Sequence, residues 1–205
     1  MADSPADDLP IWARPEPATR QPRLSRDQIA VAALAIADAE GFDAVTMRRI
    51  ARALGAGTMS LYRYIATRAD LLALIDDALL GESLVPGELP ADWKQAITMV
   101  ARKSRQTFLR HPWAVQVLPE TAAAPARQAG PNGVRHFELS LAALASAPLS
   151  AAAKQDLLAI VDDFVIGHIL RAGEPANRGD RSQLDARFER GLRLLIDGID
   201  AEEQH

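Results

Sequence analysis

The stretch TMRRIARALGAGTMSLYRYI, residues 46–65, carries four arginines and neither an aspartate nor a glutamate. The whole chain has a formal net charge of −4, so this positive charge is a local feature. The segment Gly55-Ala56-Gly57 interrupts the stretch, and glycine lets a chain reverse its direction within a few residues. The stretch therefore predicts a helix-turn-helix, with one helix from Thr46 to Leu54 and a second from about Thr58 to Ile65.

Capping signals predict further helices on both sides of this stretch. Ser25 and Gln28 have the spacing of a capping box, and Gly41 stands where a left-handed residue would end the helix that Ser25 begins. Thr67 and Asp70 repeat the spacing, which predicts a connector helix from Thr67 to about Leu80. Together these signals predict a small group of three helices followed by a connector.

The rest of the chain also reads as helical. Hydrophobic residues make up 48% of the sequence but aromatic residues only 5%, and this balance favours helices over strands. We expect an all-α protein of about nine helices, with an N-terminal three-helix bundle joined by the connector helix to a larger C-terminal helical bundle. The expected divisions are a disordered tail over 1–22, a helix-turn-helix domain over 23–66, and the connector plus the larger bundle over 67–205. Within the tail, Trp12 is either a mobile residue or a docking anchor.

Several classes of protein are disfavoured by what the sequence lacks. No segment approaches the roughly 18 consecutive apolar residues that a membrane-spanning helix needs, and the N-terminus does not resemble a secretory signal. The absence of cysteine excludes disulfides and thiolate metal sites, and it fits a reducing cytoplasm. We therefore expect a cytoplasmic protein that has no membrane partner and needs no cofactor or metal.

The predicted second helix of the helix-turn-helix has an outer face suited to DNA. On a helical wheel Leu61 and Ile65 face inward, whereas Met59, Ser60 and Arg63 lie opposite. Small side chains permit close approach to the base edges of the major groove, and arginine donates to guanine or to phosphate. Tyr62 and Tyr64 flank this face, where their hydroxyls are placed to reach phosphates.

The preceding helix adds positive charge. Arg48, Arg49 and Arg52 make its outer surface basic, and its amino end near Thr46 offers free N–H groups that suit a phosphate. Arg68 adds a further charge nearby. The competing interpretation is an ordinary solvated helical hairpin, because surface arginines are common.

The segment LSRDQIAVAALAIADAEGFDAVTMRRIARALGAGTMSLYRYIATRADLLALI, residues 24–75, closely resembles the N-terminal domain of TetR-type transcriptional regulators. DWKQAITMVARKSRQTFLRHPWAVQVL and FERGLRLLIDGIDA resemble, more weakly, the effector domain of the tetracycline-repressor-like branch. The resemblance implies DNA contacts at ten positions of this chain. These positions are Thr46, Met47, Arg48, Thr58, Met59, Ser60, Tyr62, Arg63, Tyr64 and Arg68. Met59 cannot hydrogen-bond a base, so its contact would be apolar.

Two helices of the larger bundle are apolar around much of their circumference. They are expected over Ala151–Ala172 and Leu184–Ala201. Such helices are either fully buried in the core or packed both on the core and on a second subunit. In the family that the chain resembles, the corresponding helices form a four-helix dimer interface. The resemblance therefore implies a homodimer whose interface includes Leu157, Val161, Val165, Phe188, Leu192 and Leu195.

The remaining large side chains of the bundle allow two interpretations. They either fill the core or line a buried, mostly apolar effector cavity, with three histidines as its polar groups. The candidates for such a cavity are Trp93, Met99, Phe108, His111, Trp113, His136, Phe137, Phe164 and His168.

The sequence and the resemblance together predict a ligand-responsive transcriptional regulator and not an enzyme. We expect a repressor that binds a palindromic, double-stranded operator as a dimer and is released by a small apolar effector. The alternatives are a nonspecific architectural DNA-binding protein, a protein-interaction module that no longer binds DNA, and a small helical metal enzyme. The last would need Asp162, Asp163, His136 and His168 to converge, although the sequence contains no pair with the spacing of H-E-x-x-H.

Overall fold

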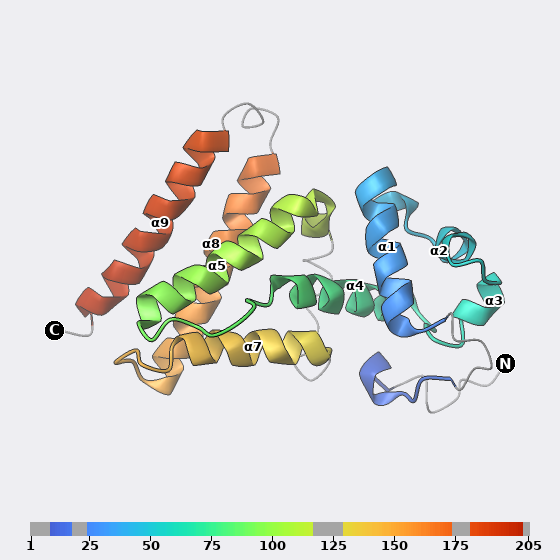
Figure 1. The fold of residues 1–205 in the computed structure, drawn as a ribbon, viewed down its shortest axis with the longest axis horizontal. Helices are drawn as coiled ribbons and strands as arrows, with labels where there is room; N and C mark the ends of the chain where they lie inside the picture. Colours follow the sequence, from blue (N-terminus) through green and yellow to red (C-terminus); the bar gives the residue numbers. More distant parts are fainter. Residues whose placement is uncertain (1–8, 18–23, 117–128, 174–180, 203–205) are drawn as a thin grey trace. The chain divides into compact units, whose positions relative to one another are not determined.

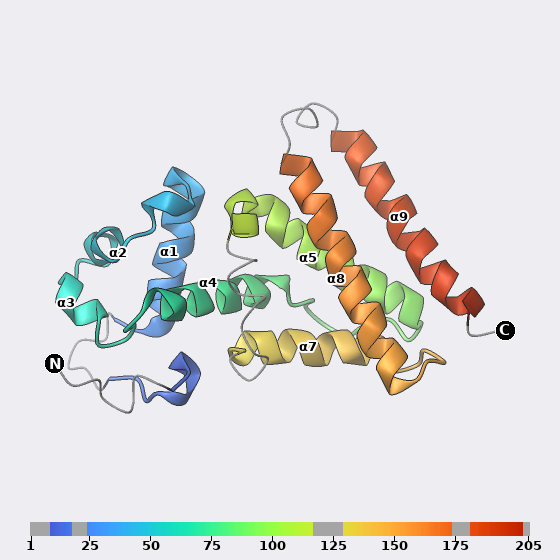
Figure 2. The same cartoon turned by 180° about the vertical axis from the view of Figure 1, so that it is seen from behind.

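The structure is a computed structural model that describes residues 9–17, 24–116, 129–173 and 181–202 (Figures 1 and 2). Within these residues it contains eight α-helices, three short 3-10 helices and no strand, which confirms the predicted all-α class. The α-helices are α1 (Arg26–Glu40), α2 (Met47–Ala53), α3 (Thr58–Leu61), α4 (Arg68–Ser83), α5 (Trp93–Arg110), α7 (Pro131–Ala143), α8 (Ala151–Gly173) and α9 (Arg181–Glu202). The 3-10 helices are η1 (Ile11–Ala13), η2 (Phe42–Ala44) and η3 (Pro112–Gln116).

The chain divides into two compact units. The first comprises residues 1–82 and 116–134, and the second comprises residues 83–115 and 135–205. Helix α4 thus belongs almost entirely to the first unit, and α7 begins in the first unit and continues into the second. None of the described helices is both long and apolar enough to cross a lipid bilayer.

The predicted capping signals are present in the first unit. The Ser25 hydroxyl accepts the Gln28 N–H at 3.1 Å, and Gly41 follows α1 with a φ of 87°. At α4, the Thr67 hydroxyl accepts the Asp70 N–H at 3.1 Å while Asp70 Oδ2 accepts the Thr67 N–H at 3.0 Å. These bonds satisfy N–H groups that the first turn of a helix leaves without partners.

The core of the first unit lies where α1 packs on α2 and α2 packs on α3. Ile29, Ile50, Leu61 and Ile65 are all less than 2% exposed there. Burial of one such side chain stabilises a fold by about 1.5–3 kcal/mol. The periodicity of the sequence placed Leu61 and Ile65 on the inner side, and the structure confirms this.

The expectation of a disordered tail over residues 1–22 is wrong for residues 9–17, which pack against the first unit. Ile11 is 3% exposed, and the Arg14 side chain forms an ion pair with Asp70. The carbonyl of Arg14 also accepts a hydrogen bond from Arg26 Nη1 at 2.9 Å. Residues 1–8 and 18–22 lie outside the described residues. The sequence contained no sign of this packing because the residues that contact the segment, such as Asp70, are distant along the chain.

In the second unit, α5 packs on α8 and α8 packs on α9, which run side by side in both ribbon views (Figures 1 and 2). Phe188 on α9 is fully buried, with its ring centroid 5.4 Å from that of Phe164 on α8. A Cβ on Gly191 would overlap the Phe164 ring, so the glycine permits this close approach of α8 and α9.

The expected dimer stripe faces the core of its own subunit. Five of its six members are at most 3% exposed, which leaves them no surface to offer a partner, and Leu195 is half-buried. The buried members are Leu157, Val161, Val165, Phe188 and Leu192. The expectation is therefore wrong for these five residues. Apolar spacing identifies an inward face but does not tell which of two apolar faces a neighbour covers.

Candidate nucleic-acid interface

The turn between α2 and α3 is closed by backbone hydrogen bonds. The N–H of Ala56 donates to the Ala51 carbonyl at 2.9 Å, and the N–H of Gly55 donates to the Arg52 carbonyl at 3.3 Å. This pair of bonds is a Schellman motif, which ends a helix with a residue in the left-handed region. Gly55 occupies that position with a φ of 62°, where a Cβ would be strained. The glycine therefore sets the direction in which α3 leaves α2.

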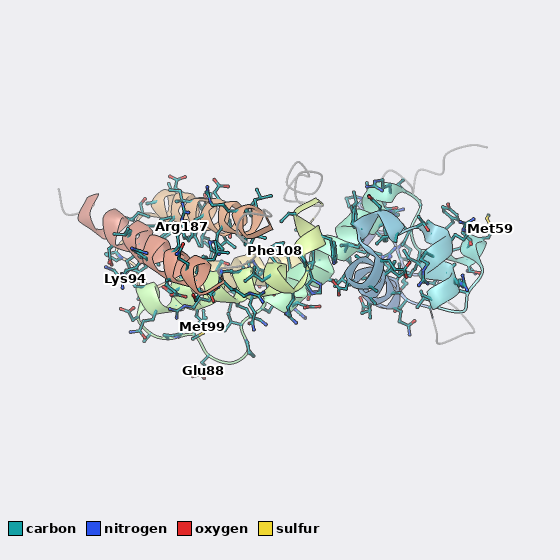
Figure 3. All side chains as sticks on the ribbon, turned by 90° about the horizontal axis from the view of Figure 1, so that it is seen from above. Met59, Glu88, Lys94, Met99, Phe108 and Arg187 are labelled. Atoms are coloured by element: carbon teal, nitrogen blue, oxygen red, sulfur yellow. The ribbon has the colours of Figure 1, made fainter. Side chains whose placement is uncertain are left out.

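The outer face of α3 is exposed as the sequence predicted. Met59 is 77% exposed and lies at the surface of the first unit, as Figure 3 shows. Ser60 and Arg63 are exposed, and Tyr62 is 49% exposed. Thr58 is half-buried. The face therefore combines one small polar, one apolar, one phenolic and one cationic side chain.

Tyr64 does not belong to this face, which corrects the sequence analysis. It is 2% exposed, and it follows α3, which ends at Leu61 and does not continue to Ile65. The Tyr64 N–H donates to the Leu61 carbonyl at 2.8 Å, and this tight turn stacks residues three apart on one side. Tyr64 consequently lies on the same inner side as Leu61. Its hydroxyl is buried without a hydrogen-bond partner among the described residues.

Helix α2 presents part of the expected basic surface. The Thr46 hydroxyl accepts the Arg49 N–H at 3.2 Å and caps the helix, as predicted. Arg48 is exposed and Met47 is half-buried. Arg49, however, forms an ion pair with Glu40 at the end of α1, with Arg49 Nε 3.1 Å from Glu40 Oε1. This hydrogen bond raises the pKa of Arg49 and lowers that of Glu40.

The Arg49–Glu40 pair reduces the positive charge that α2 offers to a nucleic acid. Glu40 precedes the acid-free stretch and is nine positions from Arg49 along the chain. No helical spacing links them, so the sequence contained no local signal of the pairing. Arg49 therefore links α2 to the end of α1 through an exposed ion pair.

Arg68 lies at the first position of α4 and is exposed. Its guanidinium carbon is 5.8 Å from the centre of the Phe42 ring, which lies in η2 between α1 and α2. The contact places this charge near the helix-turn-helix, as the sequence analysis expected. The described structure thus brings Thr46, Arg48, Met59, Ser60, Tyr62, Arg63 and Arg68 to the surface of the first unit.

The candidate effector residues all fall in the second unit but differ in burial. Five are buried: Trp93, Phe108, His111, Trp113 and His168. His136 and Phe164 are half-buried. Met99 is 37% exposed and Phe137 is 51% exposed, so neither lies in the closed interior that the sequence analysis expected. Met99 instead borders a surface groove of about 410 Å³ on α5. Figure 3 labels Met99 on this helix.

The three candidate histidines have different surroundings. His136 Nε2 lies 3.3 Å from the Ser104 hydroxyl, and burial lowers the pKa of this histidine. The His111 ring meets Trp113 edge to face at 5.8 Å between centroids. His168 Nε2 is buried without a hydrogen-bond partner among the described residues. His168 is therefore the one of the three with a fully buried ring nitrogen that has no partner in the described structure.

His168 is held neutral by its surroundings. Its ring packs 5.0 Å from that of Phe188. Burial lowers its pKa to about 4, and the charge of Arg105 acts in the same direction. Arg171 and Arg187 lower the pKa further, whereas Asp185 raises it. The folded chain thus carries a neutral imidazole here at physiological pH.

The lowered pKa of His168 predicts that the free energy of unfolding decreases in acid. The unfolded chain protonates His168 near its ordinary pKa of 6.5 but the folded chain only near 4, so stability falls as the pH is lowered from 6.5 to 4. The loss should be on the order of 2–3 kcal/mol. Urea unfolding at several pH values should show it, and His168→Gln should lack that part of the pH dependence. Parallel curves for the two proteins would contradict the prediction.

The residues required by the metal-enzyme alternative do not converge. Within the described residues, no group of three or more histidine, aspartate or glutamate side chains is placed to hold a metal ion. That alternative therefore has no support from the described geometry.

Comparisons with known proteins match both parts of the chain. Residues 29–75 match the family model described as bacterial regulatory proteins, tetR family, and residues 85–184 match tetracyclin repressor-like, C-terminal domain. An HTH-type transcriptional regulator of Saccharopolyspora erythraea is 32% identical over 93% of this chain and 91% of its own length.

Solved structures give the same picture. The TetR family protein ActR of Streptomyces coelicolor, in complex with actinorhodin, superposes with a TM-score of 0.74. It is 28% identical, and the match covers 89% of this chain and 98% of that one. BioQ with its double-stranded DNA operator superposes with a TM-score of 0.68 at 25% identity, over 87% of this chain and 99% of that one.

Proposed function

Because this chain belongs to the TetR family of bacterial transcriptional regulators, we propose that it represses transcription by binding a palindromic operator as a homodimer and leaves the operator when an effector binds. The observation that carries the proposal is the exposed outer face of α3 and of the turn after it, with Ser60, Tyr62 and Arg63 on an acid-free segment. The proposal assigns no catalytic step to the chain. It also places the protein in the cytoplasm, where the operator would be.

Readout of DNA would fall to residues 23–66. Met59 and Ser60 would approach base edges in the major groove, and Arg63 would donate to a guanine or to a phosphate. Arg48 and Tyr62 would donate to phosphates, and so would the backbone at the amino end of α2 near Thr46. Neither Arg48 nor Arg63 has an ion pair or hydrogen bond within the described residues, which leaves both free for such contacts.

Dimerisation would use the faces of α8 and α9 that the subunit leaves uncovered. Ile160 and Leu170 on α8 are 46% and 52% exposed, and Leu194 on α9 is 66% exposed. Asp163 on α8 and Arg190 on α9 are also exposed, so a two-fold axis would let acidic and basic residues of the two copies meet. One short recognition helix reads few bases, and two copies supply the missing affinity and specificity.

The effector would be a small, mostly apolar molecule held in the second unit. The similarity to ActR, whose solved complex holds actinorhodin, supports a small-molecule effector. Besides Arg105 Nε, two buried polar side-chain atoms lack partners among the described residues of this unit, namely His168 Nε2 and Thr107 Oγ1. Both would suit the few polar groups of such a ligand. A ligand that favours the DNA-free arrangement by ~1–3 kcal/mol would lower operator affinity roughly 5–150-fold.

Selection of bound duplexes from a random pool tests the proposal. A palindromic consensus, bound with an affinity that falls steeply with salt, is the expected result. Equal affinity for unrelated duplexes would favour the architectural alternative. If the chain recovers no duplex at low salt, both the operator-binding proposal and the architectural alternative are contradicted.

The two tyrosines after α3 provide a matched pair of tests. Tyr62→Phe should weaken binding of the selected duplex by about 0.5–1.5 kcal/mol per half-site, because an exposed phosphate donor is lost. Tyr64→Phe should leave DNA binding unchanged and should not destabilise the fold, because it removes a buried hydroxyl without a partner. Fluorescence anisotropy and thermal unfolding measure the two effects. Equal losses of affinity would contradict the assignment.

A further inference from the structure

Residues 9–17, which we call the N-terminal strap, lie against α4 at two places. Ile11, in the 3-10 turn η1 of the strap, is 3% exposed. The strap is therefore anchored in the packed interior of the first unit. The helix-turn-helix fold does not by itself account for this segment, which precedes α1.

Arg14 is the first anchor. Its guanidinium pairs with Asp70, and the two side chains are only 10% and 11% exposed. The other oxygen of Asp70 accepts the N–H groups of Ala66 and Thr67 at 2.9 and 3.0 Å. Arg14 thus holds the cap that begins α4, directly after the segment proposed to contact DNA.

Trp12 is the second anchor. Its ring lies so close to Gly130 that a Cβ at position 130 would overlap both the ring and the Asp77 carboxylate. Gly130 is buried and immediately precedes α7. Trp12 therefore packs where the amino end of α7 meets α4.

Asp77 joins these two helices. Its Oδ1 accepts the N–H groups of Asn132 and Gly133, both at 2.9 Å, and its Oδ2 accepts the Asn132 side-chain amide at 2.9 Å. Asp77 is 5% exposed, and its carboxylate suits the positive end of the α7 dipole. Asp70 and Asp77 are two helical turns apart on one face of α4, and the strap meets α4 beside both of them.

We propose that the N-terminal strap positions α4 for operator binding, with Arg14 and Trp12 as its two positioning residues. This inference rests on the proposed function. The strap ties the cap of α4 to the junction of α4 with α7. Because α4 follows the recognition segment directly, a loosened α4 would let that segment adopt more orientations.

A loosened α4 weakens binding through the population of the competent state. Only some orientations of the recognition segment let the dimer contact both half-sites at once. The apparent dissociation constant equals the intrinsic one divided by the fraction of molecules in those orientations. Loss of either anchor should therefore weaken operator binding by about tenfold, which corresponds to a competent fraction of roughly one tenth. Loss of both anchors should weaken operator binding by less than the product of the two separate fold-changes, because Arg14 and Trp12 act through the same strap.

The test compares Arg14→Gln, Trp12→Ala and the double variant with two controls in the same segment. Trp12→Phe keeps an aromatic ring at position 12 and exchanges the indole for a smaller phenyl ring, which also removes an indole N–H that has no partner among the described residues. Leu9→Ala removes an apolar side chain that is 48% exposed. The probe is the duplex that the wild-type chain selects from a random pool. Binding is measured at a temperature at which every variant is folded, and hydrogen exchange of residues 68–82 is followed in parallel.

The expected result is faster exchange in α4 and about tenfold weaker binding for Arg14→Gln and Trp12→Ala, with both controls like the wild type. Wild-type affinity in both strap variants would overturn the inference, even if α4 exchanges faster. Equal losses in the variants and the controls would also overturn it. If the wild-type chain itself selects no duplex, the proposed function has failed, and the positioning role fails with it.

Discussion

Arg63→Ala should weaken binding of the selected operator by at least about tenfold, since one arginine contact to a base is worth about 1–3 kcal/mol in each half-site. Arg63 is exposed on the outer side of the turn that follows α3, and it has no ion pair or hydrogen bond within the described residues. Its removal should therefore leave the fold intact. Anisotropy titrations over a range of salt concentrations measure the loss.

The salt dependence distinguishes the two possible contacts of Arg63. A base contact predicts relaxed specificity at one position of each half-site, whereas a phosphate contact predicts uniform weakening and a salt slope reduced by about one per arginine. Arg135→Ala is the matched control, because it removes the same charge from an exposed position on α7, outside both the proposed DNA-binding face and the proposed dimer face. Unchanged operator affinity in Arg63→Ala would remove α3 from the proposed interface.

Phe188→Ala should destabilise the fold of the subunit by about 3–5 kcal/mol, as expected for truncation of a buried aromatic residue. Phe188 is 0% exposed, and its ring contacts those of Phe164 and His168. The Arg105 guanidinium also stacks 4.7 Å from the Phe188 ring centre. Urea unfolding should show the loss at every protein concentration, because the missing contacts lie within one subunit.

Leu194→Asp provides the contrasting variant. Leu194 is 66% exposed on the same helix, so its replacement should change the subunit fold little. It should instead raise the dissociation constant of the dimer, measured by sedimentation, if the exposed faces of α8 and α9 form the interface. The assignment would be contradicted if Phe188→Ala weakened the dimer without destabilising the subunit while Leu194→Asp left the dimer unchanged.

Two of these predictions depend on which side of a helix is covered. The apolar residues of α8 and α9 surround much of each helix, so the sequence indicated burial without indicating the covering element. The described structure places Phe188 and Leu157 against the subunit's own core and leaves Ile160 and Leu194 exposed. The sequence-based choice of interface residues failed because each choice depended on a neighbouring helix that is distant along the chain.

The local features of this protein follow from the sequence alone. Ser25, Thr46 and Thr67 cap the helices that they were predicted to cap, and Gly55 takes the left-handed conformation that turns α2 into α3. Capping and turn chemistry depend on residues within a few positions of one another. The helix-turn-helix and the exposure of Arg63 were therefore predictable.

The tertiary structure alone decided the features whose partners are remote in the sequence. Tyr64 is buried although the sequence placed it beside the outer face, and Arg49 pairs with Glu40 across two helices. Arg14 of the strap pairs with Asp70, which is 56 positions away along the chain. Such contacts arise only after the helices pack, because burial and charge pairing depend on distance in space and not on spacing along the chain.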